Sequence, residues 1–401
     1  MSIVIESVQV IKKSDYDVIV AGAGIAGIAA AIAARRRGHK VLLIEKTINL
    51  GGLATNGLVT YFNPSLCDRR GRRIIGGIAE ELLHLSVKYG CGTLSPEWTY
   101  RKVKVENDAV YHTQFSAPNF IAALDELVCD TGIDLLLDTL CCNVFMENGL
   151  CKGVFMENKE GRVFFGCKQL IDTTGDLDLF KRAGAPCVEN LNWLSCWALS
   201  VSMDKIKKCI KNNDIQDALI VNMLGADRTN TNNAPDMRRY SLGSGEEVTE
   251  FILRGRRYVL DFLKKMDIKN EMITTLPSQA QYRTTRYINA DYILTNEDMD
   301  KTHEDSIGCA YRAHNIGFFM EIPYRTMVLN DYPNMITAGR TIASIDLACE
   351  LTRLIAPGAV TGEAAGIAAS IAIEKNYKIA SVPVDILQRE IVAAGGIIHY
   401  K

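Results

Sequence analysis

Short apolar runs alternate with glycine-rich turns at the start of the chain. Residues 16–21 and 41–45 are two such runs. Residues 25–37 are mainly alanine and isoleucine and end in an arginine cluster at 35–37. Short apolar runs next to turn residues indicate buried strands, and the longer small-residue stretch between them indicates a helix that ends at the turn residue Gly38. The pattern predicts a strand, a helix and a second strand, which together form a βαβ unit.

The pattern continues through the next hundred residues with further helices and strands. "GGIAEELLHLSVKYG" at 76–90 predicts a helix with one apolar face, and "FIAALDELVCDTGIDLLLDT" at 120–139 predicts a helix followed by a strand. The segment VFMEN occurs at 144–148 and again at 154–158, and "ENKEG" separates the second copy from another strand-like run. These runs predict a three-stranded antiparallel meander, after which "KQLIDTTGD" returns to a buried strand.

From residue 188 to about 330 the pattern changes to long charged helices at 204–213 and 246–267. "NMITAGR" and "APGAVTGEAAGIAASIAIEK" then restore a buried strand and a small-residue helix. At 401 residues, two domains are the prior expectation. We predict a discontinuous nucleotide-binding domain made of residues 1–60, 113–187 and 331–376. A substrate or lid domain made of residues 61–112 and 188–330 is inserted into it. Residues 377–401 form a C-terminal extension.

Charge and composition indicate a small-molecule partner. Lysine and arginine number 45 against 47 acidic residues, a net charge of −2, and no long run carries one sign. This balance has no electrostatic footprint for nucleic acid or an anionic membrane, and the longest early apolar stretch is interrupted by glycines. We expect neither partner, while an oligomer remains compatible with the sequence.

Cysteine usage indicates a reducing compartment and packing roles. The chain has twelve cysteines, which is sparse for a disulfide scaffold, and no C-x-x-C pair. The six histidines form no pattern such as H-E-x-x-H, so we predict no metal site. No charged-then-apolar leader precedes the first motif, and the predicted location is the cytoplasm.

The turn after the first strand carries the sequence G-x-G-x-x-G at Gly22, Gly24 and Gly27. In this position the first glycine allows a tight turn, the second lets the backbone approach a pyrophosphate, and the third lets the helix pack closely on the strand. Glu45 ends the second strand eighteen residues after Gly27, where an acid accepts hydrogen bonds from ribose hydroxyls. Together these residues predict a dinucleotide site.

A second glycine pair, Gly51-Gly52, favours FAD over NAD as that dinucleotide. A cofactor that continues past the pyrophosphate as a ribityl chain and a ring would run beside the loop after the second strand. Residues without Cβ allow backbone contact there. An ordinary Gly-Gly turn explains the pair equally well when it is taken alone.

The combined signature resembles the FAD-dependent oxidoreductases that have a glutathione-reductase-like FAD-binding fold. The blocks "GGIAEEL", "IDTTGDLDLFKRAGAP", "IPYRTMV" and "TAGRTIAS" are similar to a bacterial family of such enzymes. The resemblance implies an α/β fold: a Rossmann-like FAD-binding domain with a parallel sheet and a three-stranded β-meander, plus an inserted α+β substrate domain. It also implies that Val144 offers backbone to the adenine, that Gly175 and Asp176 lie near the phosphates or ribose, and that Gly339-Arg340 lies near the ribityl-pyrophosphate.

Asp176 has an alternative role as the N-cap of the short helix after it. Pro357 and Gly358 open the last predicted helix, whose N-terminus would face the flavin and stabilise negative charge on it. The predicted cofactor residues are Gly22, Gly24, Ile25, Ala26, Gly27, Glu45, Lys46, Gly51, Gly52, Leu53, Val144, Thr174, Gly175, Asp176, Gly339, Arg340, Gly358, Ala359 and Val360.

Three residues are candidates for the chemistry. Arg353, four residues before Pro357, could bind the flavin or a substrate carboxylate bidentately. Arg283 and Arg286 would face opposite sides of an extended segment, so at most one of them serves a given ligand and the other pairs with an acid or the cofactor; Arg283 is the candidate for binding. His314 is the histidine to test as an acid or base. Each of them has a structural alternative, namely a salt bridge or a buried hydrogen bond.

These features predict a FAD-dependent oxidoreductase that transfers a hydride between the flavin and a small organic substrate. "GSGEE" and "GEAAG" lack the context of a second nucleotide fingerprint. Electrons would therefore pass directly to or from the substrate, a transient NAD(P)H or an electron-transfer protein. Two alternatives stay open: a thiazole-synthase-like protein that uses NAD, and a flavin-bearing electron-relay subunit with no activity alone.

Overall fold

The computed structural model describes residues 7–62, 66–67, 73–90, 94, 113–215, 218–226, 237–311 and 319–400. The centre of these residues is a parallel sheet in the order β6-β3-β2-β9-β19. The strands span, in that order, Asp134–Leu136, Val41–Ile44, Tyr16–Ala21, Gly161–Asp172 and Met335–Thr337. The predicted βαβ unit and returning strand are confirmed.

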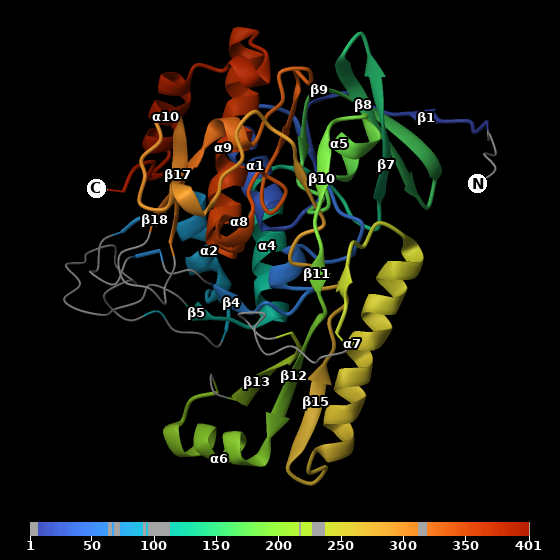
Figure 1. The fold of residues 1–401 in the computed structure, drawn as a ribbon, viewed down its shortest axis with the longest axis vertical. Helices are drawn as coiled ribbons and strands as arrows, with labels where there is room; N and C mark the ends of the chain where they lie inside the picture. Colours follow the sequence, from blue (N-terminus) through green and yellow to red (C-terminus); the bar gives the residue numbers. More distant parts are fainter. Residues whose placement is uncertain are drawn as a thin grey trace.

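Alternate side chains of β2 supply two different cores. Val18 and Val20 pack in one cluster with helices α1 (Ile25–Arg36) and α9 (Ile355–Lys375), while Ile19 and Ala21 pack in another with the meander. Since successive strand residues point to opposite faces, a strand that is apolar throughout must be covered on both sides. Figure 1 shows this layering, with α1 and α9 together on one side and β7, β8 and the short helix α5 (Asp178–Arg182) on the other.

Helices α1 and α9 touch backbone to backbone. A Cβ on Gly362 would lie 2.1 Å from the Ala26 carbonyl oxygen, and one on Gly366 would lie 2.3 Å from that of Ala30. This contact explains why both helices are built from small residues. Within the described part of the chain, α9 alone is long and apolar enough to cross a membrane, and 94% of its apolar window is buried inside the protein.

One carboxyl group is buried within this helix pair. Glu363, in the middle of α9, is 3% exposed and accepts a hydrogen bond from the Ile78 amide at 3.0 Å. Burial raises the pKa of Glu363 to about 7. An acid whose pKa is raised in the folded state stabilises the fold fully below its unfolded pKa and loses this contribution as pH rises through the folded pKa.

We therefore expect Glu363→Gln to be more stable than the wild type at pH 8 but not at pH 5. The wild type should lose about 3 kcal/mol of unfolding free energy over this range from this group. Urea unfolding at the two pH values measures the difference. The exposed Glu160→Gln is the control, and a Glu363→Gln variant that loses stability in parallel with the wild type would contradict the assignment.

The predicted meander is confirmed and is continuous with the parallel sheet. β7 (Leu140–Glu147) pairs antiparallel with β8 (Leu150–Asn158), and the two VFMEN copies fall on these neighbouring strands, with Val144 opposite Val154. β9 pairs antiparallel with β8 up to Gly166 and parallel with β2 from Cys167 onwards. The third meander strand and the returning buried strand are thus one strand.

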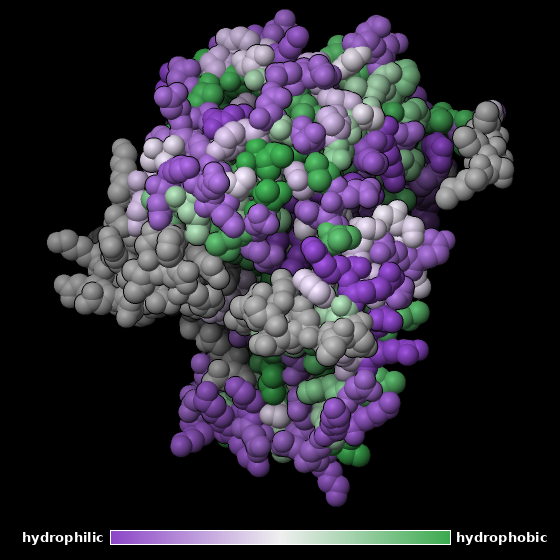
Figure 2. Space-filling view, in the orientation of Figure 1, coloured by the Kyte–Doolittle hydropathy of each residue, from purple (hydrophilic) through white to green (hydrophobic). Residues whose placement is uncertain are grey.

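The inserted segment forms a separate layer below the parallel sheet (Figure 1). β12 (Ser195–Ser202) is the middle strand between β13 (Leu219–Gly225) and β15 (Glu271–Thr275). The predicted charged helices are α6 (Met203–Asn212) and α7 (Gly245–Lys265), and the face of this layer seen in Figure 2 is largely hydrophilic. The chain enters and leaves the segment through one antiparallel pair, β10 (Cys187–Glu189) with β16 (Arg286–Ile288).

Residues after β16 return to the main core. The hairpin β17 (Ser306–Tyr311) and β18 (Phe319–Pro323) packs on α9, and Ile307, Met320 and Ile322 share a cluster with α1. Leu387 of the C-terminal helix α10 joins the same cluster. The exact division into domains stays a prediction. Further elements are β1 (Ile11–Lys12), β4 (Tyr61–Phe62), α2 (Ile78–Ser86), β5 (Thr113–Gln114), α4 (Ala117–Thr131), β11 (Asn192–Trp193), β14 (Arg239–Tyr240), α8 (Asp346–Thr352) and α10 (Val384–Ala393).

Candidate cofactor and active site

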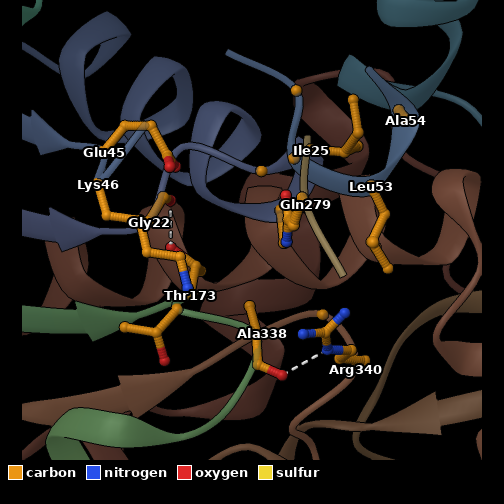
Figure 3. Close-up of a pocket in the computed structure, with 18 of the residues that line it drawn as sticks. Gly22, Ile25, Glu45, Lys46, Leu53, Ala54, Thr173, Gln279, Ala338 and Arg340 are labelled. Atoms are coloured by element: carbon orange, nitrogen blue, oxygen red, sulfur yellow. Dashed lines mark hydrogen bonds between the residues drawn. The ribbon is translucent and has the colours of Figure 1, made fainter. Parts of the chain in front are cut away.

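A cavity lies at the carboxyl ends of β2, β3 and β9, the edge where open parallel sheets bind ligands. Its empty volume is about 980 Å³, counted with the space at its open mouth. Figure 3 shows side chains from distant segments converging on it, including Glu45, Thr173, Gln279 and Arg340. The predicted residues that line it are Gly22, Gly24, Ile25, Ala26, Glu45, Lys46, Gly51, Gly52, Leu53, Thr174, Gly175, Gly339, Arg340, Arg353 and Gly358.

The three glycines of the turn are required for three different reasons. Gly22 has φ +100°, and a Cβ there would lie 2.4 Å from the Thr173 carbonyl oxygen. A Cβ on Gly27 would lie 1.8 Å from the Gly22 carbonyl oxygen, so Gly27 lies under the turn and does not line the cavity. A Cβ on Gly24 would meet no atom within 4 Å and would project into open space. Gly24 is thus the glycine whose missing side chain leaves room for a ligand at the start of α1.

Glu45 is held by backbone donors at the end of β3. The amide of Ala23 donates to its Oε2 at 2.9 Å, and the amide of Thr47 donates to its Oε1 at 2.9 Å. The carboxylate is 7% exposed and lines the cavity. Because each oxygen retains a free lone pair, the group is prepared to accept hydrogen bonds from a pair of hydroxyls, as on a ribose.

The second glycine pair packs against the first glycine turn. The amide of Gly51 donates to the Ala23 carbonyl oxygen at 2.9 Å, and a Cβ on Gly52 would lie 3.0 Å from the Gly24 Cα. Gly51 and Gly52 have φ of +98° and +56°, which favour glycine. The pair therefore both lines the cavity and allows the loop after β3 to fold back onto the phosphate turn.

Arg340 is fixed by an ion pair beneath the cavity. Its Nη2 lies 2.9 Å from Asp176 Oδ1, its Nη1 donates to the Tyr282 carbonyl oxygen at 3.0 Å, and its Nε donates to the Gly175 carbonyl oxygen. Burial alone would raise the pKa of Asp176, but the charges of Arg340 and Lys46 and a hydrogen bond from Thr285 bring it below its usual value. Asp176 does not line the cavity and instead orients Arg340, which does.

The alternative role of Asp176 as a helix cap is wrong. Residue Leu177 is the N-cap of α5 and makes no side-chain cap. The amides of Leu179 and Phe180 donate instead to Asp172 Oδ2 at 2.9 and 3.1 Å. Asp172 is fully buried at the end of β9, and burial raises its pKa to about 6.

Helix α9 begins at Ile355, two residues before the predicted start, and Pro357 lies in its first turn. Leu354, Ile355 and Gly358 line the cavity, so the start of this helix lies at its wall. Ala359 and Val360 do not line it, and Val360 packs on β17, where a Cβ on Gly308 would lie 2.2 Å from its Cγ1.

Arg353, just before α9, has an unpaired donor at the cavity. Its Nη2 donates to Glu350, while its Nε is buried and has no hydrogen-bond partner within the described residues. A buried N–H without a partner is unfavourable, which indicates a ligand acceptor at this point. Together with the open cradle at Gly24, this donor shows that the cavity fits a long dinucleotide that carries acceptors at both ends.

The structure does not bring the remaining predicted residues to the cavity. Val144 lies farther along β7, and the start of that strand lines the cavity in its place. Arg283 does not line it, and its backbone amide donates to Asn192 Oδ1 at 3.0 Å. Arg286 pairs with Asp178 at 3.2 Å, as expected for one of the two arginines. His314 lies outside the described residues.

Several residues that line the cavity are not among those predicted from the sequence motifs. They include Asp178 and Gln279, and residues close in sequence to the predicted motifs or at the start of β7, namely Ile44, Ala54, Thr139, Leu140, Cys141, Thr173, Ala338, Leu354 and Ile355. Most are sequence neighbours of predicted residues, so a wider window around each motif would have found them. Gln279 has no such signal because it arrives from the inserted segment.

Comparison with known proteins gives a consistent assignment. The FAD dependent oxidoreductase family matches residues 17–208 and 202–391. The tRNA uridine 5-carboxymethylaminomethyl modification enzyme MnmG of Treponema denticola is 62% identical over 176 residues, 41% of this chain and 26% of that protein. The chain thus spans about a quarter of this relative's length.

Among solved structures, p-nitrophenol 4-monooxygenase PnpA from Pseudomonas putida has a TM-score of 0.48 at 12% identity and covers 96% of this chain and 89% of its own. L-proline dehydrogenase from P. horikoshii has a TM-score of 0.43 at 14% identity, with coverages of 95% and 99%. Likenesses at this level carry no information on the substrate. The family match, in contrast, runs through every segment that lines the cavity, and the chain therefore belongs to the FAD dependent oxidoreductase family, with FAD as its cofactor.

Proposed function

We propose that this enzyme exchanges a hydride between its flavin and a small organic substrate bound between the cofactor cavity and the inserted segment. The observation that carries the proposal is the position of Gln279, which belongs to the inserted segment and lines the cofactor cavity. The flavin, when bound, supplies the hydride chemistry, while the protein binds and orients both partners.

Different residues of the cavity would bind different parts of FAD. Gly24 and the start of α1 would hold the pyrophosphate, and Glu45 would accept hydrogen bonds from the ribose hydroxyls. Arg353 and the first turn of α9 would supply positive potential that favours a negatively charged reduced flavin. Arg283 and His314 stay candidate substrate residues.

The first experiment is the visible spectrum of the purified protein, followed by denaturation to identify the released nucleotide. We expect FAD. Anaerobic addition of NADH or NADPH then tests the electron donor: bleaching indicates a reductase, and persistent colour indicates substrate oxidation or an electron-transfer partner. A colourless protein that cannot take up FAD would reject the proposal and favour the alternative that uses NAD.

The relay alternative predicts no turnover alone and turnover when a partner protein is added. The tRNA activity in the name of the Treponema relative is not part of the proposal, because this chain spans about a quarter of that protein and has a net charge of −2 with no long run of basic residues. We place the enzyme in the cytoplasm, and this is supported by the free thiols of all eleven cysteines that the structure describes.

Arg353→Ala should leave FAD bound but make its reduction potential more negative by about 30 mV or more, because a positive charge beside the ring is lost. Equilibration with a reference dye measures the potential without any substrate. Arg353→Lys keeps the charge and should shift it much less. Equal flavin reduction potentials in the wild type and Arg353→Ala would show that Arg353 does not lie beside the flavin.

A further inference from the structure

A second cavity lies beside the cofactor cavity, under helix α7. We call it the α7 cavity; it is lined by Cys196 of β12, by Phe251, Ile252 and Arg256 of α7, and by residues 276–281. Its empty volume is about 550 Å³ with the space at its mouth. Gly255 lets α7 approach β12 closely, since a Cβ there would lie 3.0 Å from the Cys196 Cβ.

Gln279 joins the two cavities, because it lines both of them. The amides of Ser278 and Gln279 both donate to the Asn56 carbonyl oxygen, at 3.0 and 3.3 Å. Gln281 accepts a hydrogen bond from the Trp197 amide at 2.6 Å and donates to the Gly57 carbonyl oxygen. The bonds to Asn56 and Gly57 attach residues 278–281 to the loop that carries Gly51-Gly52, and Gln279 Oε1 lies 3.9 Å from the Cβ position on Gly52 (Figure 3).

Two polar groups of the α7 cavity have no partner within the described chain. Among the residues that the structure describes, the Arg256 guanidinium and the Gln279 carboxamide have no hydrogen-bond or ion-pair partner, whereas Arg254 on the same helix lies 3.3 Å from Glu250. Arg256 is an exposed residue of α7 that lines the cavity, and Gln279 is partly buried. The rest of the lining is mainly apolar, from Phe251, Ile252 and Pro277.

We propose that the α7 cavity is the substrate subsite and takes small organic carboxylates, with the carboxylate on Arg256 and the reacting end directed past Gln279 to the flavin. This inference rests on the proposed function. A single exposed guanidinium beside a mainly apolar lining matches one carboxylate bound bidentately, with the apolar body of the ligand in the cavity. Gln279 can donate to or accept from the reacting end, which suits a substrate that changes oxidation state there.

The test is a titration of the FAD-loaded protein with propionate and with benzoate, followed by the difference spectrum of the flavin. We expect saturable perturbation by at least one of the two acids, and none of comparable affinity by the matching neutral amides. Arg256→Ala should weaken binding about tenfold or more, because a charge-assisted hydrogen bond is lost, and Arg256→Lys should weaken it less.

Arg257→Ala is the matched control, since Arg257 is the next residue of α7 and lines a separate hollow on its outer face. It should bind the acids as the wild type does. Equal affinities of Arg256→Ala and Arg257→Ala for the acids, or no spectral change with either acid, would contradict the carboxylate subsite. Neither result would contradict the proposal that the protein is a flavoenzyme. A protein without bound FAD would overturn the proposed function itself.

Discussion

Gly24→Leu should give a folded protein that is purified without FAD. The Gly24 position has negative φ, and a Cβ there would meet no atom within 4 Å, so a side chain can be added without strain in the protein. It would fill the space at the start of α1 where the pyrophosphate must approach the backbone. The ratio of released FAD to protein should fall from about one to near zero, while the circular dichroism spectrum stays that of the wild type.

Two sets of variants make this result specific. Gly245→Leu is the control, because Gly245 also has open space around its Cβ position but lies on α7, away from the cofactor cavity; it should keep its FAD. Gly22→Ala and Gly27→Ala should fail to fold stably, since each Cβ would overlap a carbonyl group. Stoichiometric FAD in Gly24→Leu would show that the phosphates do not lie at this turn.

Asp176→Ala should lower the free energy of unfolding by about 3 kcal/mol, because it leaves the Arg340 guanidinium buried without its counter-charge. The side chains of Asp176 and Arg340 are 17% and 8% exposed, and the pair is 2.9 Å long. Asp176 also accepts a hydrogen bond from the Thr285 hydroxyl at 2.8 Å. Urea unfolding of the variant and the wild type, each in its apo form, gives the difference.

The pH dependence separates the charge of Asp176 from its packing. The pKa of Asp176 is lowered in the folded state, so its contribution is present above the unfolded pKa and is lost as pH falls through the folded value. The gap between the wild type and Asp176→Ala should therefore narrow below about pH 4. Glu160→Gln breaks the exposed pair with Lys13 and should change stability by less than about 1 kcal/mol. A gap that stays constant with pH would mean that packing, not charge, is lost.

Asp176 has a second effect on the site because Arg340 lines the cavity. Without the carboxylate the guanidinium loses one of three fixed contacts, so FAD should also bind more weakly in Asp176→Ala. Asp176→Asn retains an acceptor for Thr285, so its affinity for FAD should lie between those of the wild type and Asp176→Ala. This order of affinities, measured by fluorescence quenching of added FAD, distinguishes a positioning role from a purely structural one.

The sequence by itself determined the elements whose signals are local. Residues 16–45 form the predicted strand, helix and strand because their apolar spacing and glycines act within a few residues. The meander followed from the repeated strand pattern, and the charged helices α6 and α7 from their own periodicity. The role of Glu45 was also local, since its place at the end of a strand puts it beside the glycine turn.

Only the tertiary structure decided how distant segments complete the site. It placed Gly52 against Gly24, paired Asp176 with Arg340, and gave Asp172 the amides assigned to Asp176. It also brought Gln279 of the inserted segment to the cofactor cavity. Propensity and periodicity act between near neighbours, whereas the contacts of Gly52, Arg340 and Gln279 join segments far apart in the sequence, and their partners are set by how the sheet, α1 and α9 pack together.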